Sequence, residues 1–153
     1  MPPGAADGIL NSLDTNILYY ATNTACPEHE KARTLLERVA REPLLWIIAD
    51  QVLFEYYRLV RNPVVLAKPL AAVEAAKKLR FFRDELGCRH CAYDRGCWEE
   101  AIVGLSEPSF PARRTFDLVL AVTLHRNGVD TFFTRNVSDF LNFGWFKIID
   151  PLA

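Results

Sequence analysis

The sequence predicts an α/β domain built around a mainly parallel sheet. Short apolar runs alternate with longer amphipathic segments along the chain, as expected when strands are followed by helices. The run LLWIIAD at 44–50 is apolar almost without interruption, which is typical of a strand covered on both faces. Strands that alternate with helices in this way are joined by right-handed crossovers.

Five short apolar runs are the expected strands. The first, GILNSLD, ends at Asp14. The others are LLWIIAD at 44–50, CRHCAYD at 88–94, VDTFFT at 129–134 and FKIID at 146–150.

The longer segments between these runs are the expected helices. They begin at Thr15 or Asn16 and then cover 27–42, 51–62, 69–87, 96–107 and 116–128. Pro27 suits a first helical position, and Gly87 and Gly128 suit helix ends. Asp50 and Thr115 are expected to cap the helices that follow them.

Length and charge restrict the class of protein. The 153 residues fit one domain at 9–153 after a short lead-in at 1–8, which we expect to be disordered. A net charge of −1 argues against coating nucleic acid by bulk electrostatics, but not against a nucleic-acid enzyme that binds divalent cations. No apolar run approaches the roughly 18 residues of a membrane span, and no secretory signal is evident, so we expect a cytoplasmic protein.

Three of the four cysteines lie close together in the sequence. Cys88, Cys91 and Cys97 occur in GCRHCAYDRGC with His90 between the first two, and this spacing could bind zinc. A closed zinc site normally has two well-separated ligand pairs, whereas only one pair occurs here. The sequence therefore favours free thiols around a buried strand and leaves zinc as the alternative.

Four acidic residues follow strands or begin the helices beyond them. Asp14 follows the first strand, and Glu55 lies about one turn into the helix after the second. Asp117 lies in the first turn of the helix at 116–128, and Asp139 follows the fourth strand. Because open α/β sheets bind ligands at the carboxyl ends of their strands, we expect all four to converge over one edge of the sheet.

Carboxylates gathered in one cleft repel one another unless a cation lies between them. Ligand sets made only of oxygen suit Mg²⁺ or Mn²⁺. Such an ion can activate a water and hold a phosphoryl oxygen, and two ions can stabilise both the attacking and the leaving oxygen. The acidic residues therefore predict cleavage of phosphodiester bonds.

Each carboxylate also has an ordinary explanation when it is considered alone. Asp14 could cap a helix, Glu55 could pair with Arg58 on an exposed helix face, and Asp117 could favour a helix start. Asp139 could be a loop or helix cap. The metal-site prediction therefore depends on the joint position of the four.

Four motifs carry a resemblance to a known family. At LDTN, FEYYRLVRNP, TFDLVLAVTL and TRNVSDF the sequence resembles the PIN-domain family, and within it the VapC-type toxin ribonucleases. The motifs occur in the order of that family between Leu13 and Phe140. The resemblance implies a three-layer α/β/α fold with a mainly parallel five-stranded sheet, and Mg²⁺- or Mn²⁺-dependent endonucleolytic hydrolysis of RNA.

The resemblance also assigns roles to individual residues. The catalytic, metal-binding carboxylates would be Asp14, Glu55, Asp117 and Asp139. The supporting polar residues would be Asn16, Thr134 and Asn136. Many relatives have an aspartate at the position of Asn136, so the alternative is that Asn136 is the fourth position and Asp139 is peripheral. Three arginines flank the inferred site and would hold the RNA backbone, unless they are solvated loop charges: Arg113, Arg114 and Arg135.

The resemblance implies a toxin that is held in check by a small antitoxin and that itself often forms a homodimer. The alternatives are a DNA-directed or RNA-processing nuclease and a catalytically inactive PIN-like binding module. A phospho-accepting receiver is disfavoured because Asp14 has no adjacent acid, and a haloacid-dehalogenase-type phosphatase because Asn16 stands where a second aspartate is expected.

Overall fold

Five parallel strands form the centre of the computed structural model, which describes residues 9–153. The strands are β1 (Asn11–Leu13), β2 (Ile47–Ala49), β3 (Arg89–Cys91), β4 (Thr131–Phe133) and β5 (Lys147–Ile149). Strand β1 pairs with β4 and β4 with β5, while β2 pairs with β3. A parallel bridge between Asn11 and Trp46 joins the two groups, which gives the order β3-β2-β1-β4-β5. The expected lead-in at 1–8 lies outside the described residues.

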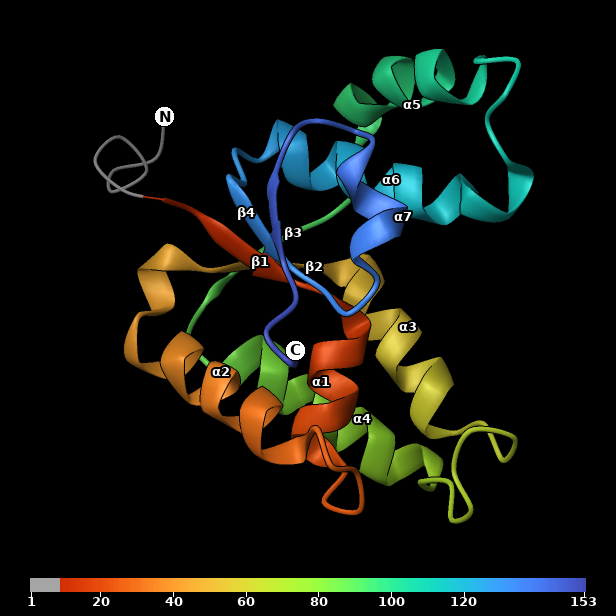
Figure 1. The fold of residues 1–153 in the computed structure, drawn as a ribbon. Coiled ribbons are helices and arrows are strands. Elements are labelled where there is room, and N and C mark those ends of the chain that lie inside the picture. Colours follow the sequence, from red (N-terminus) through yellow and green to blue (C-terminus); the bar gives the residue numbers. More distant parts are fainter. Residues whose placement is uncertain (1–8) are drawn as a thin grey trace.

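Helices cover both faces of this sheet, so the predicted three-layer α/β/α architecture is confirmed. The helices of the described chain are α1 (Thr15–Thr22), α2 (His29–Arg41), α3 (Asp50–Val60), α4 (Ala72–Arg80), α5 (Trp98–Leu105), α6 (Thr115–Arg126) and α7 (Val137–Leu141). Figure 1 shows α1 to α4 gathered on one side of the sheet and α5 to α7 on the other. None of the described helices combines the length and the apolar character that crossing a membrane requires.

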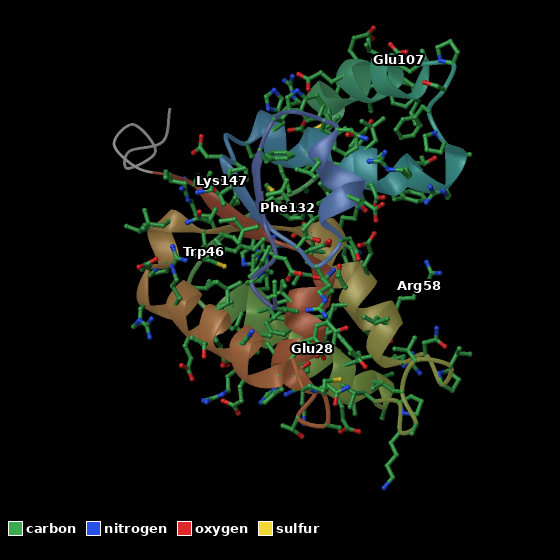
Figure 2. All side chains as sticks on the ribbon, viewed as in Figure 1. Glu28, Trp46, Arg58, Glu107, Phe132 and Lys147 are labelled. Carbon is green, nitrogen blue, oxygen red and sulfur yellow. The ribbon has the colours of Figure 1, made fainter. Side chains whose placement is uncertain are left out.

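Aromatic side chains fill the space between the layers. Phe132 on β4 and Trp46 beside β2 are fully buried, and both are labelled within the fold in Figure 2. The Phe132 ring meets Phe140 of α7 at 4.8 Å, and Trp46 meets Phe133 at 5.1 Å between ring centroids. These contacts fix β4 against its neighbours, and β4 leads directly into the candidate site.

Two predicted helix caps are wrong, and one predicted helix is divided. Asp50 is the first residue of α3, and its carboxylate accepts a hydrogen bond from Arg83. Thr115 is the first residue of α6, because a 3₁₀ turn at Ala112–Arg114 leads straight into that helix. The segment expected to be one helix at 69–87 forms α4 followed by a π-helical turn at Phe81–Glu85.

The cysteine cluster lies beside β3. Cys88, Cys91 and Cys97 are free and buried, and burial raises the pKa of the Cys88 thiol to about 11 and that of Cys91 to about 12. Among residues 9–153, no three His, Cys, Asp or Glu side chains lie where together they could hold a metal ion. The environment of these cysteines is therefore that of structural core residues.

The order in which the chain adds strands to the sheet reverses at β1. The connection from β1 leads to β2 on one side, whereas β4 and then β5 lie on the other side. Such a change opens a crevice at the carboxyl ends of the two central strands. The backbone N–H of Asp14 donates to the carbonyl of Phe133 at 3.0 Å, and the N–H of Thr134 donates to that of Ile149 at 2.9 Å. The ends of β1 and β4 are thereby held side by side at this crevice.

Replacing Phe132 with alanine should destabilise the fold strongly. The side chain is fully buried, so its removal leaves a cavity as well as removing apolar contacts. We expect the free energy of unfolding to fall by about 3–5 kcal/mol in urea denaturation. The matched control is Phe54→Ala, because Phe54 is 68% exposed and its loss should change stability by about 0.5 kcal/mol or less. Equal effects of the two changes would contradict this description of the core.

Candidate active site

Asp14 lies at the end of β1 with its carboxylate almost completely buried. One carboxylate oxygen accepts the backbone N–H of Thr15 at 2.8 Å, and the other accepts the hydroxyl of Thr134 at 2.7 Å. Asp14 therefore does cap α1, as its ordinary explanation required. That explanation leaves open why a carboxylate, rather than a neutral cap, stands at a position that is only 6% exposed.

The electrostatic environment of Asp14 is unfavourable for its charged form. The pKa of this carboxyl is raised from 3.8 to about 6: burial is the largest cause, the negative charges of Glu55 and Asp117 add to it, and the two hydrogen bonds oppose it. Two acidic groups from distant parts of the chain thus add to the effect of burial on Asp14. This is the electrostatic situation that a bound cation relieves.

Glu55 faces Asp14 from α3 and is held by two neighbours. Its carboxylate accepts hydrogen bonds from the Thr15 hydroxyl at 3.1 Å and from the Gln51 amide at 3.1 Å. The Gln51 amide also donates to the carbonyl of Phe116 at 2.9 Å, which links α3 to the start of α6. No ion pair joins Glu55 to Arg58 among the described residues, so the ordinary explanation of Glu55 is not the one the structure favours.

Asp117 and Asp139 come from the first turns of α6 and α7. Burial raises the pKa of Asp117, and the charge of Asp139 adds to this effect, while Arg114 opposes it. Arg114 places its Nε 4.0 Å from a carboxylate oxygen of Asp117 and donates a hydrogen bond to the backbone carbonyl of Asp139. The fold therefore brings all four predicted carboxylates into one electrostatically coupled group.

The three supporting residues connect the loop after β4 to the start of α1. Thr134 is fully buried and donates to Asp14, and the backbone N–H of Asn136 donates to the Thr134 hydroxyl at 3.0 Å. The side-chain oxygen of Asn16 accepts the backbone N–H of Arg135 at 3.3 Å. Asn136 is exposed, whereas Asp139 is partly buried and its charge raises the pKa of Asp117; the assignment of Asp139 as the fourth position stays a prediction.

The three arginines near the site differ in their surroundings. Arg113 is exposed, and Arg135 lies 4.0 Å from Asp150 with 38% of its side chain exposed. Arg114 has only 13% of its side chain exposed and faces the carboxylates of its own chain. The resemblance assigns one role to all three arginines, whereas in the structure Arg113 and Arg135 are exposed and Arg114 is largely buried.

Two site residues, Thr15 and Gln51, were not among those predicted. Thr15 follows Asp14 directly, and its hydroxyl bridges to Glu55. Gln51 lies four residues before Glu55, so both stand on one face of α3. This i, i+4 spacing of an amide and a carboxylate was the available signal for Gln51.

The chemistry of these side chains fits a hard divalent cation, because every carboxylate supplies only oxygen. Within residues 9–153, however, no three His, Cys, Asp or Glu side chains are already arranged to hold a metal ion. An ion would therefore have to draw the carboxylates closer than they stand here. The positive charge of such an ion would offset the repulsion between the carboxylates and the cost of burying the charge of Asp14.

Comparisons with known proteins give close relatives over nearly the whole chain. Ribonuclease VapC24 of Mycobacterium tuberculosis H37Rv is 40% identical over 144 residues, which cover 93% of this chain and 97% of the relative. Ribonuclease VapC48 of the same strain is 29% identical over 143 residues, with the same coverage of each chain. No protein-family model matches the chain.

Two solved structures share the fold at lower sequence identity. VapBC2 from Rickettsia felis, bound to a DNA fragment from its promoter, gives a TM-score of 0.64 at 20% identity, covering 92% of this chain and 98% of that one. VapC20 from Mycobacterium tuberculosis, a toxin that cleaves the sarcin–ricin loop, gives 0.64 at 16% identity, covering 88% and 95%. At these identities the likeness concerns the fold.

Replacing Asp14 with asparagine should stabilise the metal-free protein at neutral pH. The native pKa of Asp14 is about 6, against 3.8 for the ordinary group, so the protonated form is favoured in the folded state. The stability that this proton contributes is complete below about pH 4 and is lost as the pH rises through about 6. In urea denaturation with chelator at about pH 7.5, Asp14→Asn should be more stable than the wild type by about 1–3 kcal/mol.

The exposed change Asp84→Asn is the control, and it should leave stability within about 0.5 kcal/mol of the wild type. The advantage of Asp14→Asn should disappear near pH 4. If the variant were less stable than the wild type at neutral pH, the charge of Asp14 would not be the unfavourable element that this geometry indicates.

Proposed function

Because the chain belongs to the VapC family of PIN-domain proteins, we propose that it is a metal-dependent endoribonuclease that acts in the cytoplasm as the toxin of a toxin–antitoxin pair. The observation that carries this proposal is the buried Asp14 carboxylate, which lies at the topological switch point under the influence of Glu55 and Asp117. The relative that is 40% identical is named a ribonuclease, which supports RNA as the substrate.

The four carboxylates would hold Mg²⁺ or Mn²⁺. A bound divalent cation would supply charge neutralisation and Lewis acidity to the phosphodiester. Asp14 is fixed by two hydrogen bonds and would be the rigid ligand. Glu55, Asp117 and Asp139 are less buried than Asp14, so they have more freedom to adjust.

The residues of the chain would then bind and orient the reactants. A partly exposed carboxylate of the group that does not itself contact the ion would accept the proton of the attacking water. Arg113 and Arg135 stand at the accessible rim, where they would contact the phosphates on either side of the cleaved bond. Thr15 and Gln51 keep Glu55 turned toward the site.

A groove beside the acidic site suits the proposed antitoxin. Its volume is about 610 Å³, and Glu55, Phe54, Tyr93 and Phe116 are among the residues that line it. The rings of Phe54 and Phe116 are each 68% exposed, which is unusual for side chains of this size. A small partner protein that buried these rings would also cover Glu55. A second copy of this chain is the alternative occupant.

Purified, partner-free protein should cleave RNA only when Mg²⁺ or Mn²⁺ is present. Asp14→Asn and Asp117→Asn should each reduce cleavage by at least about 100-fold, because each removes a carboxylate that would hold the ion. The measurement is the rate of fragment formation from mixed RNA and single-stranded DNA, with each metal or with chelator. The matched control is Asp84→Asn, which removes an exposed carboxylate far from the described site residues in the sequence and should cleave as the wild type does.

Each unfavourable result would identify a different fault in the proposal. Cleavage that survives chelator and both substitutions would exclude the metal-dependent mechanism. Cleavage of DNA but not RNA would support the DNA-directed alternative, and metal binding without cleavage would support an inactive binding module. Circular dichroism of each variant separates loss of chemistry from loss of fold.

A further inference from the structure

Among the described residues, Arg114 is the basic residue whose side chain forms an ion pair with one of the four carboxylates. Its side chain is 13% exposed, which is unusual for an arginine. The guanidinium lies between the first turns of α6 and α7, where it reaches Asp117 through Nε at 4.0 Å and donates to the carbonyl of Asp139. The Nε atom is fully buried and has no hydrogen-bond partner among the described residues. A buried cationic donor without a partner is costly, so its position calls for an explanation.

A column of stacked rings holds this guanidinium in place. The guanidinium carbon of Arg114 lies 5.2 Å from the ring centroid of Phe143. Phe143 stacks on Trp145 at 5.7 Å with an interplanar angle of 15°, and Trp145 stacks on His125 at 4.5 Å with an angle of 11°. Arg114 directly precedes α6 and His125 lies in its last turn, so the column runs alongside that helix, which Figure 1 shows next to α7.

The column explains why Arg114 faces inward and Arg113 does not. A cation on the face of an aromatic ring is stabilised by the ring quadrupole, most strongly where water is excluded. Arg113 carries the same charge one residue earlier, but its side chain is exposed. The fold thus holds the charge of Arg114 beside the carboxylates, whereas the side chain of Arg113 is exposed to solvent.

We propose that Arg114 is a positioning residue that acts as a built-in counter-ion of the acidic site. It contacts Asp117, which would also bind the divalent ion, and the backbone of Asp139, and its charge lowers the net negative charge that an RNA phosphate encounters. This inference rests on the proposed function for the identity of the ion and the substrate. Four ionised carboxylates with one divalent ion would leave two negative charges in the site, and Arg114 reduces these to one. A phosphodiester, which is itself an anion, approaches the site more readily as a result.

The two effects of Arg114 have opposite signs, and this makes the inference testable. A fixed positive charge repels the incoming metal ion, so its removal should tighten metal binding. The same charge favours the RNA phosphate, so its removal should weaken substrate binding. A residue that merely supports the fold of the site would weaken both when it was replaced.

The experiment compares Arg114→Gln with Arg114→Lys and with the matched neighbour change Arg113→Gln. Calorimetric titration of the partner-free proteins with Mn²⁺, without RNA, measures metal affinity independently of activity. We expect Arg114→Gln to bind Mn²⁺ about three- to tenfold more tightly, Arg114→Lys to stay near the wild type, and Arg113→Gln to change less than about twofold. In RNA cleavage, Arg114→Gln should raise KM by about tenfold with a smaller change in kcat.

Folded Arg114→Gln protein that binds Mn²⁺ no more tightly than the wild type would overturn the inference. If Arg114→Gln did not fold, Phe143→Leu would replace it, because this change keeps the charge but removes the ring that holds it. Phe143→Leu should then tighten Mn²⁺ binding in the same direction to a smaller extent, and weaker binding would overturn the inference. If the wild type neither bound Mn²⁺ nor cleaved RNA, the proposed function would be refuted as well. If the wild type were active and the variants bound Mn²⁺ with the same affinity as the wild type, only the role of Arg114 would be refuted.

Discussion

The hydrogen bond from the Thr134 hydroxyl to the carboxylate of Asp14 holds the candidate site together. It joins the residue that ends β1 to the residue that ends β4, across the crevice where the order of the strands reverses. Both residues are buried, so the bond fixes a carboxylate where water cannot stabilise its charge. The charged form of Asp14 is therefore unfavourable in the folded protein, and a bound cation would stabilise it.

The remaining acidic residues reach this point from three other elements. Hydrogen bonds from Thr15 and Gln51 orient the carboxylate of Glu55, and the positive charge of Arg114 lies beside the carboxylate of Asp117. In the described chain the carboxylates are coupled without forming a ready-made metal site. This arrangement suits a site whose ligands remain apart until an ion arrives, because the like charges otherwise repel one another and an internal arginine compensates only part of that repulsion.

The sequence predicted the sheet and the position of the acidic residues because both follow from local patterns. An apolar run that ends in Asp14, and a carboxylate in the first turn of a helix, can be recognised from neighbouring residues alone. The caps at Asp50 and Thr115 failed because the preceding backbone and the partner Arg83 were set by tertiary contacts. Arg113 and Arg114 could not be told apart either, since only the packed ring of Phe143 determines which guanidinium turns inward.

The most direct test of the account is a crystal structure of partner-free protein grown with Mn²⁺, with the ion located by anomalous scattering. We expect an anomalous peak about 2.2 Å from a carboxylate oxygen of Asp14 and from one of Asp117, with Glu55 or Asp139 on the same ion or joined to it through water. A peak bound elsewhere on the molecule, or none at saturating Mn²⁺ while Asp14 remains in its hydrogen bond to Thr134, would contradict the claim that these side chains form one cation site.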